Sequence, residues 1–343
     1  MQHSTKHIGY TFPTRHIGFA TLLVAALALI SSSCKKDTYA LPIASDKLQN
    51  EAIKRTLGPN IVGQQIEFAY AMAILPSKGK LVSCTAEASI AGAAGTYMEN
   101  RSFYTAQTGA DVGITVAPPS VTSGATTTVN YSVDTFAATL RYYYVIPEEA
   151  RGKTVSIKFT ATSSNGESVS TTMGPYTIAK MDMKLNMKVS DNNLMYISIG
   201  DSAVYNAADA ANHAGSIDLV YVYRNYATSS FAHALVAPAA DTTYLPGITL
   251  PAGVNRSAKL IKTFNLQDHN LAPAEQYGGV FIDDIDFQKQ DFTNAPNYVV
   301  NLKQGAGVWV ETADGKYRAY IYFNAVAAGS ATISMKRYVT GAK

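Results

Sequence analysis

Alternation of apolar and polar side chains with a period of two recurs along most of this chain, and no other feature constrains its fold as strongly. The runs 66–74, 129–133 and 155–161 each place apolar residues at every second position. Successive side chains of a β-strand point to opposite faces, so each run predicts a strand with one buried face. Asn165-Gly166 follows the third run and is a strong hairpin signal. Short strands separated by turn signals predict an immunoglobulin-like β-sandwich over residues 62–179.

The second half of the chain carries a similar signal. Ile217–Tyr223 is apolar on both faces, as a central strand would be, and Tyr205–His213 is expected to form one or two helical turns. Three antiparallel strands are expected at the end of the chain. We therefore place a boundary near Ile178–Met183 and predict a second, β-rich domain with minor helix over residues 180–343. The predicted fold class is mainly β, with strands at the end in 307–312, 316–324 and 331–338.

The first 33 residues have the features of a secretory signal peptide. Lys6 and Arg15 precede an apolar run over residues 17–30, and three serines lead into Cys34. A permanent membrane span needs about 20 apolar residues, so this run of 14 is short for one. A Cys directly after the small residues predicts a lipoprotein signal, in which Cys34 becomes the acylated first residue of the mature chain. The alternative is an uncleaved anchor helix with an ordinary cysteine.

Charge and cysteine content exclude several classes of protein. The chain has 28 Lys and Arg against 25 Asp and Glu, and it stays close to neutral without the signal peptide. Nucleic-acid binding needs a basic excess, so no nucleic-acid partner is expected. There are two cysteines, and once Cys34 is acylated Cys84 has no partner within the chain. A disulfide framework and a cysteine-based zinc site are therefore excluded, and Cys84 is expected to be a small buried residue.

Residues 34–61 are predicted to form a tether that ends in a short helix. The stretch from Cys34 to about Asn50 is mostly polar, as a link between membrane and fold would be. The helix is expected over Ser45–Leu57, because Ser45 or Asp46 can cap its start and Gly58-Pro59 would end it.

Three short segments resemble a family of uncharacterised two-domain lipoproteins of the Bacteroidota. They are Ile53–Asn60, Glu67–Met72 and Ala86–Gly92. That family has no established activity to transfer. Lipoproteins of the Bacteroidota often show Ser-Cys followed by Lys and Asp, and residues 33–37 resemble that pattern. This resemblance implies an outer-membrane protein that is anchored by lipid and faces the cell exterior. The lipid anchor with tandem β-domains is also similar in architecture to the accessory glycan-binding lipoproteins of starch-utilisation-type systems.

The strongest candidate site comes from a predicted hairpin at Asp314-Gly315. A two-residue turn there pairs Thr312 with Tyr317 and, further along, Glu311 with Arg318. One face then carries the single Trp of the chain beside two tyrosines, with an ion pair next to them. An exposed aromatic platform of this kind stacks sugar rings in many carbohydrate sites. The alternative is that another strand, a loop or the first domain covers it. The candidate ligand-binding residues are Trp309, Tyr320, Tyr322, Glu311 and Arg318.

Other polar and aromatic clusters receive structural interpretations. Tyr142 and Tyr144 are expected in the core of the first domain, with Tyr143 on the opposite face. The acids at 283–291 lack the spacing of a helix-loop-helix calcium site and are expected at a solvated strand end. Asp268-His269 is expected in a surface turn. No histidine pair has metal-ligand spacing, and no nucleophile elbow is present. We therefore predict no catalytic residue, no metal site and no cofactor.

These observations leave three hypotheses for function. The leading one is a non-catalytic, lipid-anchored binding module that captures a glycan or a partner protein of glycan utilisation. The second is a fimbrillin-like structural or adhesion subunit, in which cleavage after Arg55 would free a groove for a donor strand. The third is an unrecognised glycan hydrolase, whose two carboxylates would come from separate strands and so escape detection by spacing.

Overall fold

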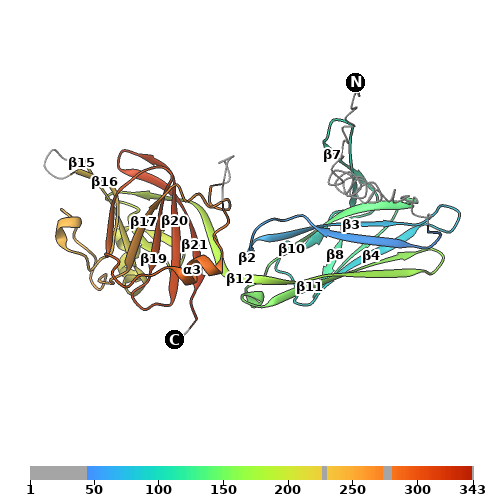
Figure 1. Cartoon of the computed structure of the whole chain (residues 1–343), viewed down its shortest axis with the longest axis horizontal. Helices are drawn as coiled ribbons and strands as arrows, with labels where there is room; N and C mark the ends of the chain where they lie inside the picture. Colours follow the sequence, from blue (N-terminus) through green and yellow to red (C-terminus); the bar gives the residue numbers. More distant parts are fainter. Residues whose placement is uncertain (1–44, 226–229, 273–279, 342–343) are drawn as a thin grey trace, which may run out of the picture. The chain divides into compact units, whose positions relative to one another are not determined.

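A computed structural model describes residues 45–225, 230–272 and 280–341. The predicted signal peptide and Cys34 lie outside the described residues. The described chain is mainly β, as predicted, and it forms two sandwiches (Figure 1). None of the helices in the described ranges has the length and apolar character that a membrane crossing requires.

The first domain packs two antiparallel sheets against each other. One sheet has the order β1-β3-β10-β5, and the layer opposite contains β12, β11, β4, β9 and β8. In Figure 1, β3 and β10 lie in one layer and β4 and β11 in the other. Buried aromatic rings from both layers form the core, among them Phe68, Tyr142, Tyr144 and Phe159. The strands are β1 (Gln49–Lys54), β3 (Gln65–Ala73), β4 (Leu81–Ala88), β5 (Tyr97–Met98), β8 (Val121–Ser123), β9 (Thr126–Asn130), β10 (Ala137–Val145), β11 (Thr154–Ser163) and β12 (Ser168–Ser190).

Two short elements extend this sandwich. β6 (Arg101–Thr105) and β7 (Asp111–Thr115) form a two-stranded hairpin that we call the β6–β7 arm. The hydroxyl of Ser102 on β6 accepts a hydrogen bond from the amide of Thr139 on β10 (3.0 Å), which places the arm beside that strand. β2 (Asn60–Val62) pairs in parallel with β12.

The second domain shares β12 with the first, because the second half of that strand pairs with β21. The sheet continues through β20 and β19 to β17 and faces a five-stranded sheet of order β14-β13-β15-β16-β18. β15 lies inside its sheet and is buried on both faces, as predicted. The strands are β13 (Tyr196–Ser198), β14 (Ala203–Tyr205), β15 (Leu219–Asn225), β16 (Ser230–Val236), β17 (Lys259–Phe264), β18 (Tyr298–Leu302), β19 (Ala306–Glu311), β20 (Tyr317–Ala327) and β21 (Ser330–Val339).

Helix is minor, as expected. The predicted turn near 205–213 is helix α2 (Ala207–Asn212), whose start is capped by the side chain of Asn206. A second helix, α3, spans Asp284–Lys289. Single 3₁₀ turns complete the described helices: η1 (Glu148–Ala150), η2 (Ala214–Ser216) and η3 (Thr242–Tyr244).

The helix predicted over Ser45–Leu57 is wrong, because this stretch contains β1. Every residue of β1 pairs with β3, from Gln49 with Ala73 to Lys54 with Phe68. Leu48 and Ala52 are buried whereas Ile53 is exposed, which is the period-two pattern of a strand. The spacing of Leu48 and Ala52 fits one face of either a helix or a strand, and pairing with β3 overrides the local helix preference. Part of the predicted tether therefore belongs to the first sandwich.

The acidic residues at 283–291 are expected at a strand end, but Asp283, Asp284 and Asp286 instead form the start of α3. Asp283 is the N-cap, and its side chain accepts hydrogen bonds from the amides of Ile285 (2.8 Å) and Asp286 (3.2 Å). Asp286 accepts a bond from the amide of Asp283 in return (2.9 Å), which completes a capping box. These acids therefore have a structural explanation at the helix N-terminus, where negative charge is favourable.

Candidate functional site

The register predicted for the hairpin at Asp314-Gly315 is confirmed. Glu311 pairs with Arg318, and Trp309 pairs with Tyr320. The turn is wider than two residues, because the amide of Gly315 donates to the carbonyl of Thr312 (2.9 Å) and Gly315 has a φ of 65°. The amide of Thr312 still donates to the carbonyl of Tyr317 (3.0 Å), so the pairing is unchanged.

The exposure expected for the aromatic face of this hairpin is wrong. Trp309, Tyr320 and Tyr322 expose 3%, 0% and 2% of their surface. Phe287 of α3 packs edge to face on Trp309, with ring centroids 5.2 Å apart. Leu271 and other residues that precede or follow α3 join the same buried cluster. A loop-rich segment therefore covers the aromatic platform, which was the second of the two interpretations, and a sugar ring has no access to it in this structure.

The predicted ion pair on the same face is confirmed. Arg318 contacts Glu311 at 2.8 Å, and both side chains are about one-fifth exposed. The Arg318 guanidinium also donates to the backbone carbonyl of Phe287 (2.6 Å) at the end of α3. This pair therefore holds the helix that covers Trp309.

An accessible aromatic site lies instead on the first domain, on the outer face of the sheet β1-β3-β10-β5. Tyr97 pairs in register with Tyr143, and Tyr143 pairs with Glu67. Arg55 continues the row, since its amide donates to the carbonyl of Glu67 (2.8 Å) and its guanidinium contacts the Glu67 carboxylate (2.9 Å). We call these four residues the Tyr97–Tyr143 site.

The two tyrosines of this site form a flat, partly exposed surface. Their rings are stacked, with centroids 4.9 Å apart and planes at 19°, and Tyr97 is 40% exposed. Burial and then the neighbouring Glu99 raise the pKa of Tyr97. Its hydroxyl therefore stays protonated near neutral pH and can donate a hydrogen bond. Tyr143 lies on the face opposite the buried Tyr142 and Tyr144, as predicted.

A cavity of about 610 Å³ opens beside Tyr143. This volume is in the range of small-molecule sites in proteins, which is roughly 300–1,000 Å³. Glu67 is the only carboxylate among the described residues that line it. The hydrogen-bonding side chains of its lining are Thr56, Gln64, Gln65, Glu67, Tyr143 and Asn270.

The β6–β7 arm is fixed over the same face by charge and by one ring. Asp111 of the arm forms an ion pair with Arg141, which also lies 3.6 Å from Glu67. The Arg141 guanidinium sits 4.2 Å from the centroid of the Phe103 ring, a cation–π contact. Beyond Phe103, a second hollow of about 470 Å³ has Ala71, Ala73 and Ala137 among its lining residues. Small side chains leave this part of the sheet open.

The Tyr97–Tyr143 site could not be predicted from the sequence. Alternation places Glu67 and Tyr143 on the wet faces of their strands, and this is the only local signal for them. The site depends on β1, β3, β10 and β5 being neighbours, and β5 and β10 are far from β1 and β3 in the sequence.

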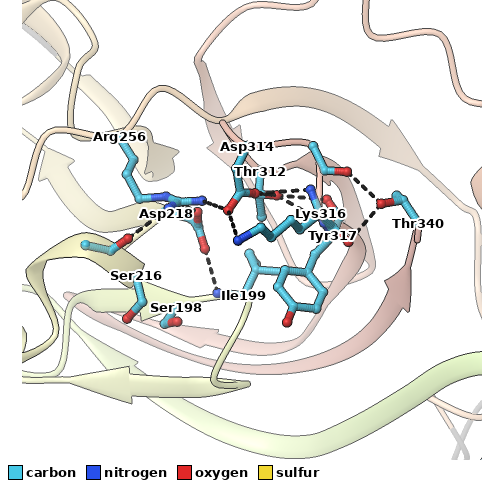
Figure 2. Close-up of polar contacts among 12 residues, drawn as sticks. Ser198, Ile199, Ser216, Asp218, Arg256, Thr312, Asp314, Lys316, Tyr317 and Thr340 are labelled. Atoms are coloured by element: carbon cyan, nitrogen blue, oxygen red, sulfur yellow. Dashed lines mark hydrogen bonds and ion pairs between the residues drawn. The ribbon is translucent and has the colours of Figure 1, made fainter. Parts of the chain in front are cut away.

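A second polar cluster ties the hairpin tip to the loops of the second domain. Figure 2 shows Arg256 between two carboxylates, with its Nε 2.8 Å from Asp218 and another nitrogen 3.1 Å from Asp314. Burial raises the pKa of Asp218 to about 6, although the Ile199 amide and Arg256 favour its charged form. Asp314 also accepts bonds from the Thr312 hydroxyl (2.7 Å) and the Lys316 amide (3.1 Å). Each charge has a partner, which favours a structural role.

The three histidines of the described chain do not form a site. His213 stacks on Tyr205. The Nδ1 atom of His233 lies 2.6 Å from the hydroxyl oxygen of Tyr221. His269 packs on Phe281. In the ranges that the structure describes, no group of three or more His, Cys, Asp or Glu side chains could hold a metal ion.

Asp268, which was predicted in a surface turn, is fully buried and contacts Lys336 at 2.6 Å. The surface-turn prediction is therefore wrong for Asp268. The neighbouring His269 is exposed.

Comparison with known proteins agrees with the two-domain arrangement. Residues 45–178 match the model for a domain of unknown function, DUF4466, and residues 179–340 match a second one, DUF8576. No curated protein matches the chain. A solved structure that is similar over most of the chain is a DUF4466 family protein from Parabacteroides merdae, with 45% identity and a TM-score of 0.80. The match covers 87% of this chain and 100% of that one, and the chain described here therefore belongs to the DUF4466 family.

Proposed function

We propose that this protein is a non-catalytic binding module that captures a glycan at the Tyr97–Tyr143 site while a lipid on Cys34 anchors it to the outer membrane, facing the cell exterior. The observation that carries the proposal is the stacked tyrosine pair in register with Glu67, beside a cavity of about 610 Å³. The register of three strands places these groups side by side on one sheet.

The chemistry of the site suits a sugar ring. A pyranose has an apolar face that packs on an aromatic ring and a rim of hydroxyl groups that need hydrogen-bond partners. Tyr143 supplies a flat ring, and the Glu67 carboxylate can accept from hydroxyl groups. Gln64 and Gln65 line the same cavity and offer both donors and acceptors.

Glycan binding can be tested by affinity electrophoresis against a panel of polysaccharides. The variant Tyr97→Ala with Tyr143→Ala should lose retention by about tenfold or more, since about 1.4 kcal/mol corresponds to a factor of ten. Tyr244→Ala is a matched control, because Tyr244 stacks on Tyr298 in the second domain with ring centroids 3.5 Å apart. Equal retention of the site variant and the wild type on every bound glycan would contradict the proposal.

The proposed address has its own test. Mass spectrometry of protein from native membranes should find an acylated Cys34 as the first residue. The proposal rests here on the apolar run 17–30 with serines before Cys34. A native chain that keeps residues 1–33 and a free thiol at Cys34 would contradict the lipid anchor.

One observation favours a fimbrillin-like subunit as a second candidate. β1 is an edge strand of its sheet, and Arg55 follows it directly. Cleavage after Arg55 would detach β1 and free the β3 edge, onto which a donor strand could add. Native protein that begins at Thr56 would support this candidate and contradict the lipid-anchored module, because the anchor would be lost.

The hydrolase hypothesis has less support from the geometry. Glycoside hydrolysis usually needs two carboxyl groups about 5–10 Å apart across the bond that is cut. The cavity beside Tyr143 has Glu67 alone among the described residues that line it.

A further inference from the structure

Lys336 occupies an unusual position in the second domain, because its side chain is fully buried on the aromatic face of the sheet. It pairs in register with Tyr320 and exposes none of its surface. Its Nζ donates to Asp268 Oδ2 (2.6 Å), Asn270 Oδ1 (2.9 Å) and the carbonyl of Ile282 (2.8 Å). The amine of Lys336 is therefore in direct contact with the carboxamide of Asn270 and the carboxylate of Asp268.

The carboxylate of this group is held rigidly. Asp268 exposes none of its surface. Its Oδ1 accepts from the amide of Asn270 (2.7 Å), and its Oδ2 accepts from the amide of Ile282 (3.0 Å). These two bonds from backbone amides hold the Asp268 carboxylate in place against Lys336.

We propose that Lys336 and Asn270 react with each other to form an intramolecular isopeptide bond, with Asp268 transferring the protons. The new bond would join Lys336 Nζ to Asn270 Cγ. The reaction needs an amine nucleophile, an amide carbon and an acid–base group in contact, and these three side chains supply them.

The reaction balances without any further reagent. The Lys336 ammonium gives a proton to Asp268, and the neutral amine adds to Asn270 Cγ. Asp268 passes that proton, and then a second proton from Nζ, to Asn270 Nδ2, and the bond from Cγ to Nδ2 breaks. One ammonium ion leaves in total, and Asp268 ends as it began. No electron is gained or lost, so no oxidant or reductant is required.

Geometry and burial both favour this step. Since a C=O bond is about 1.2 Å long, Asn270 Cγ lies at most about 4.1 Å from Lys336 Nζ, and a small reorientation brings it within the roughly 3–3.5 Å of a near-attack geometry. Burial lowers the pKa of Lys336, which favours the neutral amine that the reaction needs. Because the folded chain holds the amine and the carboxamide in contact, the two groups do not have to meet by diffusion.

Such a bond would fix the segment that covers the aromatic core. Asn270 and Lys336 are 66 positions apart, and Asn270 is followed by Leu271, which packs in the cluster around Trp309. A covalent link between this segment and β21 would keep the cover in place under proteolysis or pulling force. The inference does not depend on the proposed glycan site.

Peptide mapping of the purified full chain by mass spectrometry tests the proposal directly. Trypsin does not cleave after an acylated lysine, so the linked product is a branched peptide that joins residues 263–289 to residues 319–337. Its mass should equal the two peptides minus one ammonia. Finding both segments unlinked and at full mass in the folded wild-type protein would overturn the proposal, and this result requires no variant.

Three variants assign the roles of the residues. Lys336→Met and Asn270→Ala should each abolish the branched peptide, whereas Lys316→Met, at an exposed lysine, should retain it. Asp268→Asn should greatly slow the formation of the link in folded monomer, with folding verified by the fluorescence of Trp309. A link that forms at the wild-type rate in Asp268→Asn would overturn the role of Asp268. A branched peptide that has lost water through Asp268 would overturn the assignment to Asn270.

Discussion

Phe287 and Trp309 meet edge to face, with ring centroids 5.2 Å apart and planes at 83°. The Phe287 ring also stacks on Tyr338, at 5.4 Å and 7°. One side chain of α3 thus covers the aromatic face of the hairpin. Because a helix of six residues is not stable alone, the packing of Phe287 stabilises α3.

Replacing Phe287 by Ala should therefore open this face. The cost should be about 3–5 kcal/mol, which is typical of removing a buried Phe. Since Trp309 is the single Trp of the chain, its fluorescence reports the change without interference, and its emission should shift to the red. Ile285→Ala is the control on the same helix, because Ile285 is exposed and its loss should stay within about 0.5 kcal/mol. Equal effects of the two variants would contradict this account of α3.

The pair of Asp314 and Arg256 should make stability depend on pH. Burial raises the pKa of Asp314, but hydrogen bonds from Thr312 and the Lys316 amide, together with Arg256, outweigh it and hold the pKa at about 2. A carboxyl with a lowered folded pKa adds stability above its unfolded value near 3.9, and this contribution is lost as the pH falls toward 2.

Asp314→Asn should accordingly lower the free energy of unfolding at pH 7 by about 1–2 kcal/mol, after allowance for solvent screening of a partly exposed group. The difference from wild type should shrink between pH 4 and pH 2 in urea titrations. Lys316→Ala should have little effect, since Lys316 is exposed and 3.9 Å from Asp314. A difference that stays constant down to pH 2 would rule out the charge pair as its cause.

Asp218 should change the stability with pH in the opposite direction from Asp314. Its pKa is raised to about 6, so the folded state holds a proton between about pH 4 and pH 6 that the unfolded state releases. Stability from this group should fall as the pH rises through that window. NMR titration of the Asp218 carboxyl carbon should give a midpoint near 6, and a midpoint below 4 would contradict the assigned burial.

Cys84 should be inert toward thiol reagents in the folded protein. It is 1% exposed, and burial raises its pKa to about 12, so little thiolate is present near neutral pH. In a chain with Cys34→Ser, alkylation should proceed only as fast as the protein unfolds and should be complete in denaturant. Rapid alkylation under native conditions would show that the first sandwich is open at this strand.

Arg141 should control the position of the β6–β7 arm. Arg141→Ala removes the ion pair with Asp111 and the contact with the Phe103 ring together. Chymotrypsin should then cleave after Phe103 or Tyr104 several times faster than in wild type. Lys78→Ala is the control, because the ion pair of Lys78 with Asp46 is exposed and both residues are distant in the sequence from the β6–β7 arm. Unchanged cleavage in Arg141→Ala would mean that other contacts fix the arm.

The parts of the fold that follow from local patterns could be predicted from the sequence. The pairing of Trp309 with Tyr320 follows from the turn and the two-residue period, and the burial of Tyr142 and Tyr144 follows from alternation. β1 was misread because Leu48 and Ala52 satisfy both a helical and a strand pattern, and only its pairing with β3 decides between them.

Three features depend on tertiary contacts that no local pattern encodes: the cover on Trp309, the Tyr97–Tyr143 site and the burial of Lys336. The cover on Trp309 comes from Phe287, 22 positions earlier in the chain. The Tyr97–Tyr143 site needs four strands in one order, and strand order is set by tertiary packing. The buried position of Lys336 likewise follows from the segment that carries Asp268.

The central claim is that a glycan binds at the Tyr97–Tyr143 site, and amide hydrogen exchange with a retained glycan tests it most directly. The account predicts slower exchange in residues 55–67 and 97–99 and in 141–145 on β10, with the five-stranded sheet of the second domain unchanged. Protection confined to the second domain, with no change in these three segments, would contradict it.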